Sequence, residues 1–366
     1  MLAIVIKEFR QLRRDKRTLA MLVVLPLVLL TVFGYAASFD VSSIRTVVVG
    51  PQAQTVAARL PGQLHVTAVR PGDGRAEAAR ELRDGRAAVA VVTGGDTVQA
   101  GPGAVTVLVD GADLFAARAA VQAIGQRQPA PGGSRVATEV LFNPKLRTPV
   151  IMVPGLVGII LVFVGTMATA LGVVRERQSG TLEQLAVMPF RPRDVFLGKV
   201  LPYFCVAAVD MTVVVAAAIL LFDVPFRGSV AVFALGAVEF LFVTLGLGVL
   251  ISTVSENQGQ AIQLALMTLL PQVLLSGLIF PLQAMAAGVR WIGYLLPLTY
   301  FIQISRAVMV RGAPASALVV PLLALAGLGV AVFTLSVVRF RRDLAPSGGR
   351  SERRAEPVPA TAVGAR

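Results

Sequence analysis

The 366-residue sequence has very little cysteine, histidine or charge, and each shortage excludes a class of protein. Its single cysteine, Cys205, cannot form an intramolecular disulfide, and its single histidine, His65, excludes a cluster of Cys and His metal ligands. A Ser/His/Asp or Cys/His catalytic site would have to use that one histidine or that one cysteine. Only 15% of the residues are charged, whereas soluble domains have about 25%. We therefore expect neither a set of soluble domains nor an enzyme.

The sequence contains several long runs of apolar residues. Apolar residues make up 55% of the chain, and the mean hydropathy is +0.74. A helix that crosses a bilayer needs about 20 mostly apolar residues. We therefore predict an α-helical multi-pass membrane protein with six transmembrane helices, the first within 18–38 and the others within 149–342. The apolar stretches are roughly Leu19–Ala37, Val150–Val174, Val200–Phe222, Val230–Val254, Ala261–Phe280 and Leu318–Val338.

Clusters of lysine and arginine predict how the chain is oriented. One cluster precedes the first span, one lies in the connection 175–199, and one follows the last span. With six crossings all three fall on the same side, which the positive-inside rule assigns to the cytoplasm. We expect a cell-membrane protein with both termini in the cytoplasm. Because the basic clusters flank spans in the lipid bilayer and serve topology, we expect no nucleic-acid partner.

Residues 39–148, between the first two spans, are predicted to form a small extracytoplasmic α/β domain. Short β-rich runs alternate there with helical stretches, and glycines mark the turns. The Pro/Gly-rich residues 126–134 indicate a linker back to the membrane, and the composition of 343–366 indicates a disordered cytoplasmic tail. The expected strands are Thr46–Val49, Val66–Val69, Ala88–Thr93 and Val105–Asp110, and the expected helices lie around Arg75–Arg83 and Leu114–Ile124.

Residues 1–17 have the pattern of an amphipathic helix. Cations cover most of one face, so this helix would lie in the headgroup layer, with Arg14 and Asp15 bracing its junction with the membrane. The alternative is a basic flank that only anchors the first span. The apolar face consists of Leu2, Val5, Ile6, Phe9 and Leu12.

The connection between the second and third spans predicts a short, rigid helix at 180–189. Thr181 and Gln184 have capping-box spacing, and Gly180 before them permits a sharp entry. Leu182 and Leu185 share one face, and Pro189 ends the helix. About two turns cannot stay helical alone in water, so the helix must dock against something. The alternative is a surface loop that merely joins two spans.

Polar side chains fall inside the predicted spans. Asp210 and Glu239 lie near the middle of the third and fourth spans, and Gln263 and Gln272 lie on the fifth. An ionised carboxylate at the bilayer centre costs about 2.5–3.5 kcal/mol, and no lysine or arginine is predicted at that depth. These residues therefore either contact a substrate or titrate during transport, or they form hydrogen bonds between helices.

The segment 281–314, after the fifth span, combines aromatic residues with prolines. Trp291, Tyr294 and Tyr300 lie close in sequence to Pro281 and Pro297. A seventh crossing here would place the C-terminal arginines outside. We therefore predict an outer re-entrant or interfacial helical hairpin, with its aromatics at headgroup level.

Three stretches of the sequence resemble the permease subunits of ABC-2-type transporters. The family's coupling-helix pattern, E-x-x-x-G-T-x-E-x-L…P…GK, is similar to RERQSGTLEQLAVMPFRPRDVFLGKVLPY. Its N-terminal connecting helix and first span resemble KEFRQLRRDKRTLAMLVVLPLVLLTVFGYA, and the segment after its fifth span resembles LLSGLIFPLQAM…IGYLLPLTYFIQISRAVMVRG. The matching residues are Glu176, Gly180, Thr181, Glu183, Leu185, Pro189, Gly198 and Lys199; Lys7, Glu8, Arg14, Asp15, Pro26 and Gly34; and Ser276, Gly277, Pro281, Pro297, Thr299, Tyr300, Arg306 and Gly312.

One departure from the family concerns the outer segment. The family often has Met-Pro where this sequence has Met285-Ala286, which affects the local shape expected there.

The resemblance implies a permease subunit of an ABC exporter. Residues 180–189, Leu182 included, would then insert into a groove on an ATPase subunit, which would bind ATP and Mg. Two permease chains, identical or paralogous, would surround one pathway for an amphipathic drug, lipid or secondary metabolite, and Ser276, Gly277, Pro281, Pro297 and Tyr300 would belong to its outer gate. The sequence contains no G-x-x-x-x-G-K-[ST] phosphate loop, so the chain itself is expected to bind no cofactor.

Two other functions remain open at this point. One is a proton-coupled secondary transporter that uses Asp210 and Glu239, although the inverted repeats of that class are not apparent. The other is a membrane-anchored scaffold or sensor that signals through the outer domain.

Overall fold

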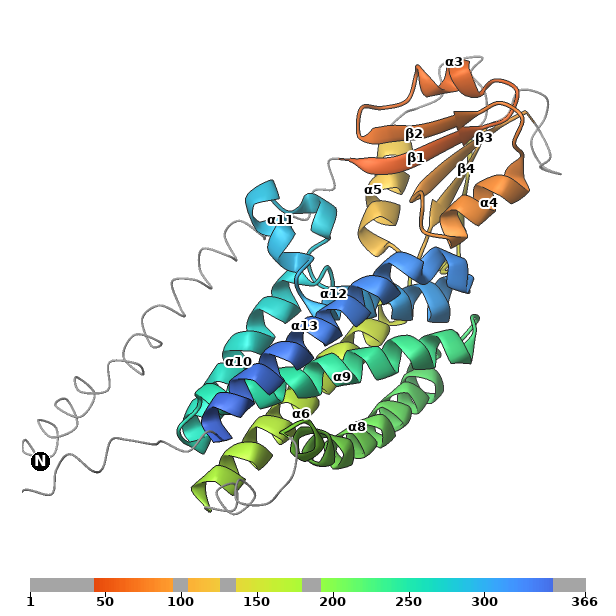
Figure 1. Ribbon diagram of the computed structural model, residues 1–366. Helices are drawn as coiled ribbons and strands as arrows, with labels where there is room; N and C mark the ends of the chain where they lie inside the picture. The colour runs from red at the N-terminus through yellow and green to blue at the C-terminus, as the bar shows by residue number, and fades with distance from the viewer. Residues whose placement is uncertain (1–42, 95–104, 126–135, 180–191, 345–366) are drawn as a thin grey trace, which may run out of the picture.

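The computed structural model describes residues 43–94, 105–125, 136–179 and 192–344 (Figure 1). In it, an α/β domain sits at one end of a bundle of long helices. The predicted connecting helix, first span, linker at 126–134, coupling helix at 180–189 and C-terminal tail from 345 onward lie outside the described residues.

The α/β domain is a five-stranded sheet with helices on both faces, which confirms the predicted α/β composition. The strands are β1 (Ile44–Val49), β2 (Leu64–Arg70), β3 (Val89–Thr93), β4 (Val105–Asp110) and β5 (Val136–Leu141), in the order β2-β1-β3-β4-β5. All neighbouring pairs are parallel except β3 and β4. The helices are α3 (Ala53–Ala57), α4 (Arg75–Arg83) and α5 (Leu114–Gly125).

Alternation of side chains along β1 explains why the sheet has a core on each face. Val48 packs in the cluster that contains Ala117 of α5, whereas Val47 and Val49 pack in the cluster that contains Leu82 of α4. Successive side chains of a strand point to opposite faces. The sequence of a strand that is buried on both faces is a nearly continuous apolar run, and the valines of β1 form such a run.

The bundle contains four helices that are long and apolar enough to cross a membrane, within the part of the chain that the structure describes. Its long helices are α6 (Thr148–Gln178), α8 (Pro192–Phe222), α9 (Val230–Val254), α10 (Gln258–Leu275) and α13 (Val319–Leu344). Helix α6 packs against α8, α9 and α10 and is the centre of the bundle. The helices α8 and α13 keep most of their side chains on the outside, where lipid or another chain would cover them.

The predicted fifth span ends earlier than expected. Helix α10 has 18 residues and stops at Leu275, whereas the prediction ran to Phe280. The cause is Gly277, whose φ of +85° no continuing helix can adopt. At about 1.5 Å per residue, α10 spans about 27 Å, and it is not among the helices long and apolar enough to cross.

The segment after α10 forms short helices rather than a seventh span. They are η1 (Leu282–Ala284), α11 (Ala287–Gly293), α12 (Pro297–Arg306), the π-helical η2 (Ala307–Arg311) and η3 (Ala315–Leu318). Helix α12 packs against α6, α9 and α13 in the core of the bundle. On α11, Trp291 is exposed and its indole N–H donates to the Gly288 carbonyl at 2.9 Å.

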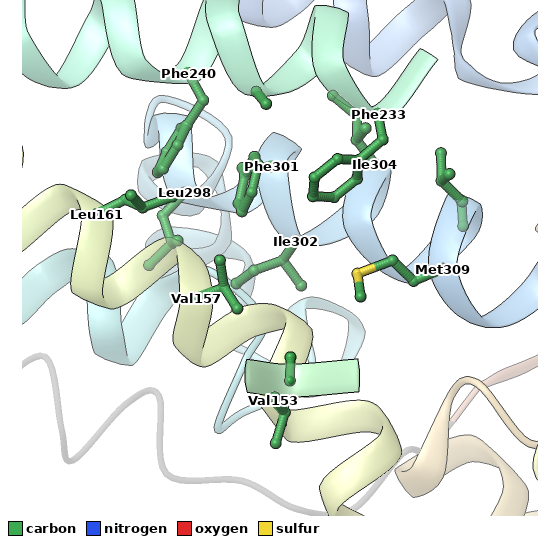
Figure 2. Packing of buried hydrophobic residues seen from close by; sticks show 14 of the residues in the cluster. Val153, Val157, Leu161, Phe233, Phe240, Leu298, Phe301, Ile302, Ile304 and Met309 are labelled. Carbon is green, nitrogen blue, oxygen red and sulfur yellow. The ribbon is translucent and has the colours of Figure 1, made fainter. Parts of the chain in front are cut away.

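Figure 2 shows how α12 is held in the bundle. Phe301 is fully buried and stacks on Phe240 of α9, with ring centroids 4.3 Å apart and planes 14° from parallel. On the α6 side, Val157 and Leu161 belong to the same cluster. A stacked aromatic pair contributes about 0.5–1.5 kcal/mol beyond its buried area, so α12 is a firmly packed part of the core.

Close approach of α6 and α9 depends on small residues, as is common between membrane helices. A Cβ atom added at Gly248 of α9 would lie 2.6 Å from the Thr166 backbone oxygen of α6 and 2.8 Å from the Thr169 Cβ. The Thr166 hydroxyl donates to the Thr244 carbonyl at 3.2 Å across the same contact.

The substitution Gly248→Ala should therefore force the two helices apart and destabilise the protein by about 1–3 kcal/mol, as overpacking does. Gly327→Ala on α13 is the matched control, because nothing lies within 4 Å of the added Cβ, and alanine favours a helix over glycine. Thermal unfolding in detergent, followed by circular dichroism, measures both. Equal midpoints for the two variants would refute the close packing of α6 on α9.

Candidate functional site

A buried ion pair joins the α/β domain to the segment that follows α12. Asp110, the last residue of β4, is 1% exposed, and its Oδ2 lies 2.9 Å from both Nε and Nη2 of Arg311. Its Oδ1 accepts the backbone N–H of Ala112 at 2.9 Å. Both charged groups are thus held by directed contacts at the junction.

The charge state of this pair follows from competing effects. Burial raises the pKa of Asp110 against the opposing pull of Arg311. Burial alone would lower the pKa of Arg311, but the Asp110 carboxylate outweighs it and raises that pKa. The raised pKa of Asp110 favours a neutral acid, whereas the raised pKa of Arg311 requires a charged carboxylate beside it. The contact geometry favours the ionised pair, because a guanidinium remains protonated in proteins and donates to this carboxylate.

The turn that carries Arg311 is itself anchored. The π-helical η2 ends at Arg311 and is followed by Gly312, whose φ of +65° favours glycine. The connection between α8 and α9 pairs with η2 through Arg227 N–H to the Met309 carbonyl (3.1 Å) and Gly228 N–H to the Val308 carbonyl (3.0 Å). The Arg227 guanidinium also donates to the carbonyls of Val310 and Phe142, each at 3.1 Å. The π turn, a feature frequent at functional sites, therefore aims Arg311 at β4.

Beside this ion pair lies a cleft of about 340 Å³, named here the interface cleft. The α/β domain forms one wall, and the segment after α10 with the start of α13 forms the other. Its lining residues are Arg45, Asp84, Gly85, Ala112, Asp113 and Phe115 on the first wall, and Ser276, Gly277, Pro281, Leu282, Gln283, Tyr294, Ile302, Gln303, Arg306, Ala307, Arg311, Ala317, Leu318 and Pro321 on the second.

The residues predicted for an outer gate are only partly brought together. Ser276, Gly277 and Pro281 line the interface cleft, whereas Pro297 and Tyr300 do not. Pro297 is buried at the start of α12. The Tyr300 hydroxyl donates to the Tyr294 carbonyl at 2.7 Å and so braces α12 against the end of α11.

The polar residues inside the spans do not line this cleft. Within the described residues, the Asp210 Oδ2 and the Glu239 Oε2 are buried without a hydrogen-bond partner, as are both polar atoms of the Gln272 amide. Gln272 is fully buried, and Gln263 on the same helix is half-buried. Neither of the two acids pairs with a lysine or arginine in the described part of the chain.

The C-terminal end of α6, away from the interface cleft, is hydrogen-bonded to the connection between α9 and α10 and to the first residue of α10. The Arg177 guanidinium donates to the Ser255 carbonyl at 3.2 Å, and the Gln258 amide donates to the Gln178 side chain at 3.1 Å. Asn257 caps α10 by accepting the Gln260 N–H at 2.9 Å. The last turn of α6, directly before the predicted coupling helix, is therefore fixed to two other long helices.

Most residues predicted to couple the chain to an ATPase lie outside the described residues, as do Lys7, Glu8, Arg14 and Asp15. Glu176 is in the last turns of α6, and its carbonyl accepts the Ser179 hydroxyl at 3.0 Å. Gly198 and Lys199 lie in the helical backbone of α8. The undescribed members are Gly180, Thr181, Leu182, Glu183, Leu185 and Pro189.

Sequence analysis missed the interface cleft and its ion pair. Asp110 and Arg311 are 201 residues apart, and no local pattern links them. The one available signal was that Asp110 ends a mostly apolar strand, since a carboxylate next to a buried run needs a partner.

Comparison with known proteins identifies the family. Residues 16–338 match the model of the ABC-2 family transporter proteins. The chain is 30% identical to the probable multidrug ABC transporter permease YbhS of Escherichia coli (strain K12), over 93% of this chain and 97% of that protein. It is 31% identical to the permease YbhR of the same organism, over 52% of each chain, and 31% identical to ABC transporter G family member 20 of Dictyostelium discoideum, over 48% of this chain and 24% of that protein. The chain belongs to the ABC-2 family of transporter proteins and is a membrane permease subunit of an ABC transporter.

Proposed function

We propose that the chain forms the pathway of an exporter in the cell membrane, driven by ATP hydrolysis on a separate ATPase subunit. ATP and Mg would bind to that ATPase, and a second copy or a paralogue of this chain would complete the pathway. Both termini would be cytoplasmic, because Arg175 and Arg177 at the end of α6 mark that end as the inner side.

The observation that carries this proposal is the path of α6. It runs from the end that meets the α/β domain, through the centre of the bundle, and ends at Gln178, two residues before the predicted coupling helix (Figure 1). Its last turn is bonded to the connection between α9 and α10. A displacement of residues 180–189 by an ATPase would therefore move α6, α9 and α10 together.

An amphipathic cargo fits this arrangement. The helices are apolar along most of their length, with only isolated polar groups such as Asp210 and Glu239. The relative YbhS is named a probable multidrug permease, which supports the same class of cargo for this chain.

Transport assays in vesicles test the proposal. The chain is reconstituted with its ATPase, and uptake of a panel of anionic and cationic amphipathic dyes is followed by fluorescence. Removing the catalytic base of the ATPase should abolish ATP-dependent dye movement, whereas a protonophore should leave it intact. Undiminished transport with the inactive ATPase would refute the proposal, and collapse under the protonophore with ATP present would favour a proton-coupled transporter.

A further inference from the structure

The interface cleft has the composition of a site for an amphipathic molecule. One part of its lining is apolar, including Leu282, Ile302 and Leu318, and another part carries arginine side chains. Its volume of about 340 Å³ lies within the usual range of ligand sites, about 300–1,000 Å³.

Arg306 supplies an unsatisfied positive charge in this cleft. Its Nε donates to the Ile151 carbonyl at 3.2 Å, but its Nη2 is buried without a hydrogen-bond partner among the described residues. No carboxylate of the described residues forms an ion pair with it, unlike Arg311. Burial lowers the pKa of Arg306 to about 10, so its guanidinium remains charged at neutral pH.

A second unsatisfied group lies on the same wall. Ser276 is 2% exposed, lines the cleft, and its hydroxyl has no hydrogen-bond partner among the described residues. A buried polar group without a hydrogen-bond partner destabilises the protein. The cleft therefore presents two buried donors that an anionic group would satisfy.

Of the three acids in or beside the cleft, two form ion pairs with arginine. Asp84 lies 3.5 Å from Arg83 Nε and also pairs with Arg86. Asp110 is paired with Arg311, whereas Asp113 accepts the Ala116 N–H at 3.1 Å and forms no ion pair among the described residues, and its charge opposes the lowering of the Arg306 pKa. Two lining arginines outside ion pairs in the described residues, Arg45 and Arg306, still leave a positive charge in excess of the one on Asp113.

The position of the cleft agrees with this chemistry. Ala317, Leu318 and Pro321, at the beginning of the apolar stretch Ala315–Arg339, line it. The ends of membrane-spanning helices lie at the level of the lipid headgroups. A ligand there would place its headgroup against the arginines and its alkyl chain along the apolar wall.

We propose that the interface cleft binds the anionic headgroup of an amphipathic molecule, with Arg306 and Ser276 as hydrogen-bond donors to it. Both a membrane phospholipid and a transported anionic amphiphile have this chemistry. The inference deepens the proposed function by specifying the ligand class, and it is tested by binding alone, without ATPase, so that its failure and the failure of the export proposal are separable.

The experiment uses the full chain, delipidated in dodecyl maltoside, and native mass spectrometry to measure affinity. Phosphatidylglycerol and dodecyl phosphate are the anionic probes, and dioleoylglycerol is the neutral control. We expect an anionic probe to bind at least about tenfold more tightly than the neutral one, because hydrogen bonds to charged groups are stronger than those between neutral groups. Binding of phosphatidylglycerol alone would identify a resident lipid, and binding of both would identify a site that accepts single-chain cargo.

Two variants test the named donors. Arg306→Gln should lower the affinity for the anionic probe about tenfold or more, and Ser276→Ala, which removes one small hydroxyl and leaves the helices intact, should lower it severalfold. Arg118→Gln is the matched control, because this exposed arginine of α5 does not line the cleft. Wild-type affinity in both Ser276→Ala and Arg306→Gln, or equal binding of neutral and anionic probes, would overturn the proposal.

Discussion

Replacing Asp110 by asparagine should lower the free energy of unfolding by about 3–5 kcal/mol, the cost of leaving a buried charge without its partner. Arg311 has 17% of its side chain exposed, and both nitrogens that contact Asp110 do so at 2.9 Å. The asparagine keeps the volume of the site but removes the negative charge. The Arg311 guanidinium would then stay charged in a largely buried position, and docking of the α/β domain on the bundle would weaken.

The matched control is an ion pair of the same types on the surface. Arg75 contacts Glu139 at 2.7 Å, but their side chains are 39% and 43% exposed. Such pairs contribute about 0–1 kcal/mol, so Glu139→Gln should change stability very little. Adding Arg311→Met to Asp110→Asn should restore part of the loss, because no buried charge then remains unpaired.

Thermal unfolding in detergent measures the three variants. Circular dichroism follows the helices, and fluorescence of Trp291, the only tryptophan of the chain, reports on α11 at the same end of the bundle. Equal unfolding temperatures for Asp110→Asn and Glu139→Gln would contradict a stabilising role for the buried ion pair.

The α/β domain was predictable because local patterns determine it. The valine-rich sequences of β1, β3 and β4 predict strands from local pattern alone. The helix predicted around Arg75–Arg83 has the same bounds as α4. The strand β5 was missed because its residues are exposed or half-buried and show no alternating pattern.

The features that depend on distant contacts could not be predicted from the sequence. The end of α10 is one of them, because the run from Ala261 to Phe280 stays apolar while the backbone turns at Gly277. The interface cleft is another, because it joins residues that are far apart in the sequence, such as Asp113 and Arg306. Short-range periodicity contains no information about such pairs.

Replacing Leu185 by alanine should uncouple ATP hydrolysis from transport. Leu185 lies on the apolar face of the predicted two-turn helix at 180–189, which needs a docking surface to remain helical. Truncating a buried leucine costs about 2–5 kcal/mol, and a loss of about 2 kcal/mol already lowers affinity roughly thirtyfold. The ATPase would continue to hydrolyse ATP while its movements no longer reached α6. Glu183→Gln, at another position of the family's motif, should act in the same direction.

Transmission of force through residues 180–189 is tested by the ratio of dye molecules transported to ATP molecules hydrolysed, measured in vesicles that contain the chain and its ATPase. Leu323→Ala is the matched control, since Leu323 on α13 is 68% exposed and far in sequence from the coupling segment. We expect this ratio to fall at least about tenfold in Leu185→Ala and to stay at the wild-type value in Leu323→Ala. A wild-type ratio in Leu185→Ala would contradict transmission of force from the ATPase through residues 180–189.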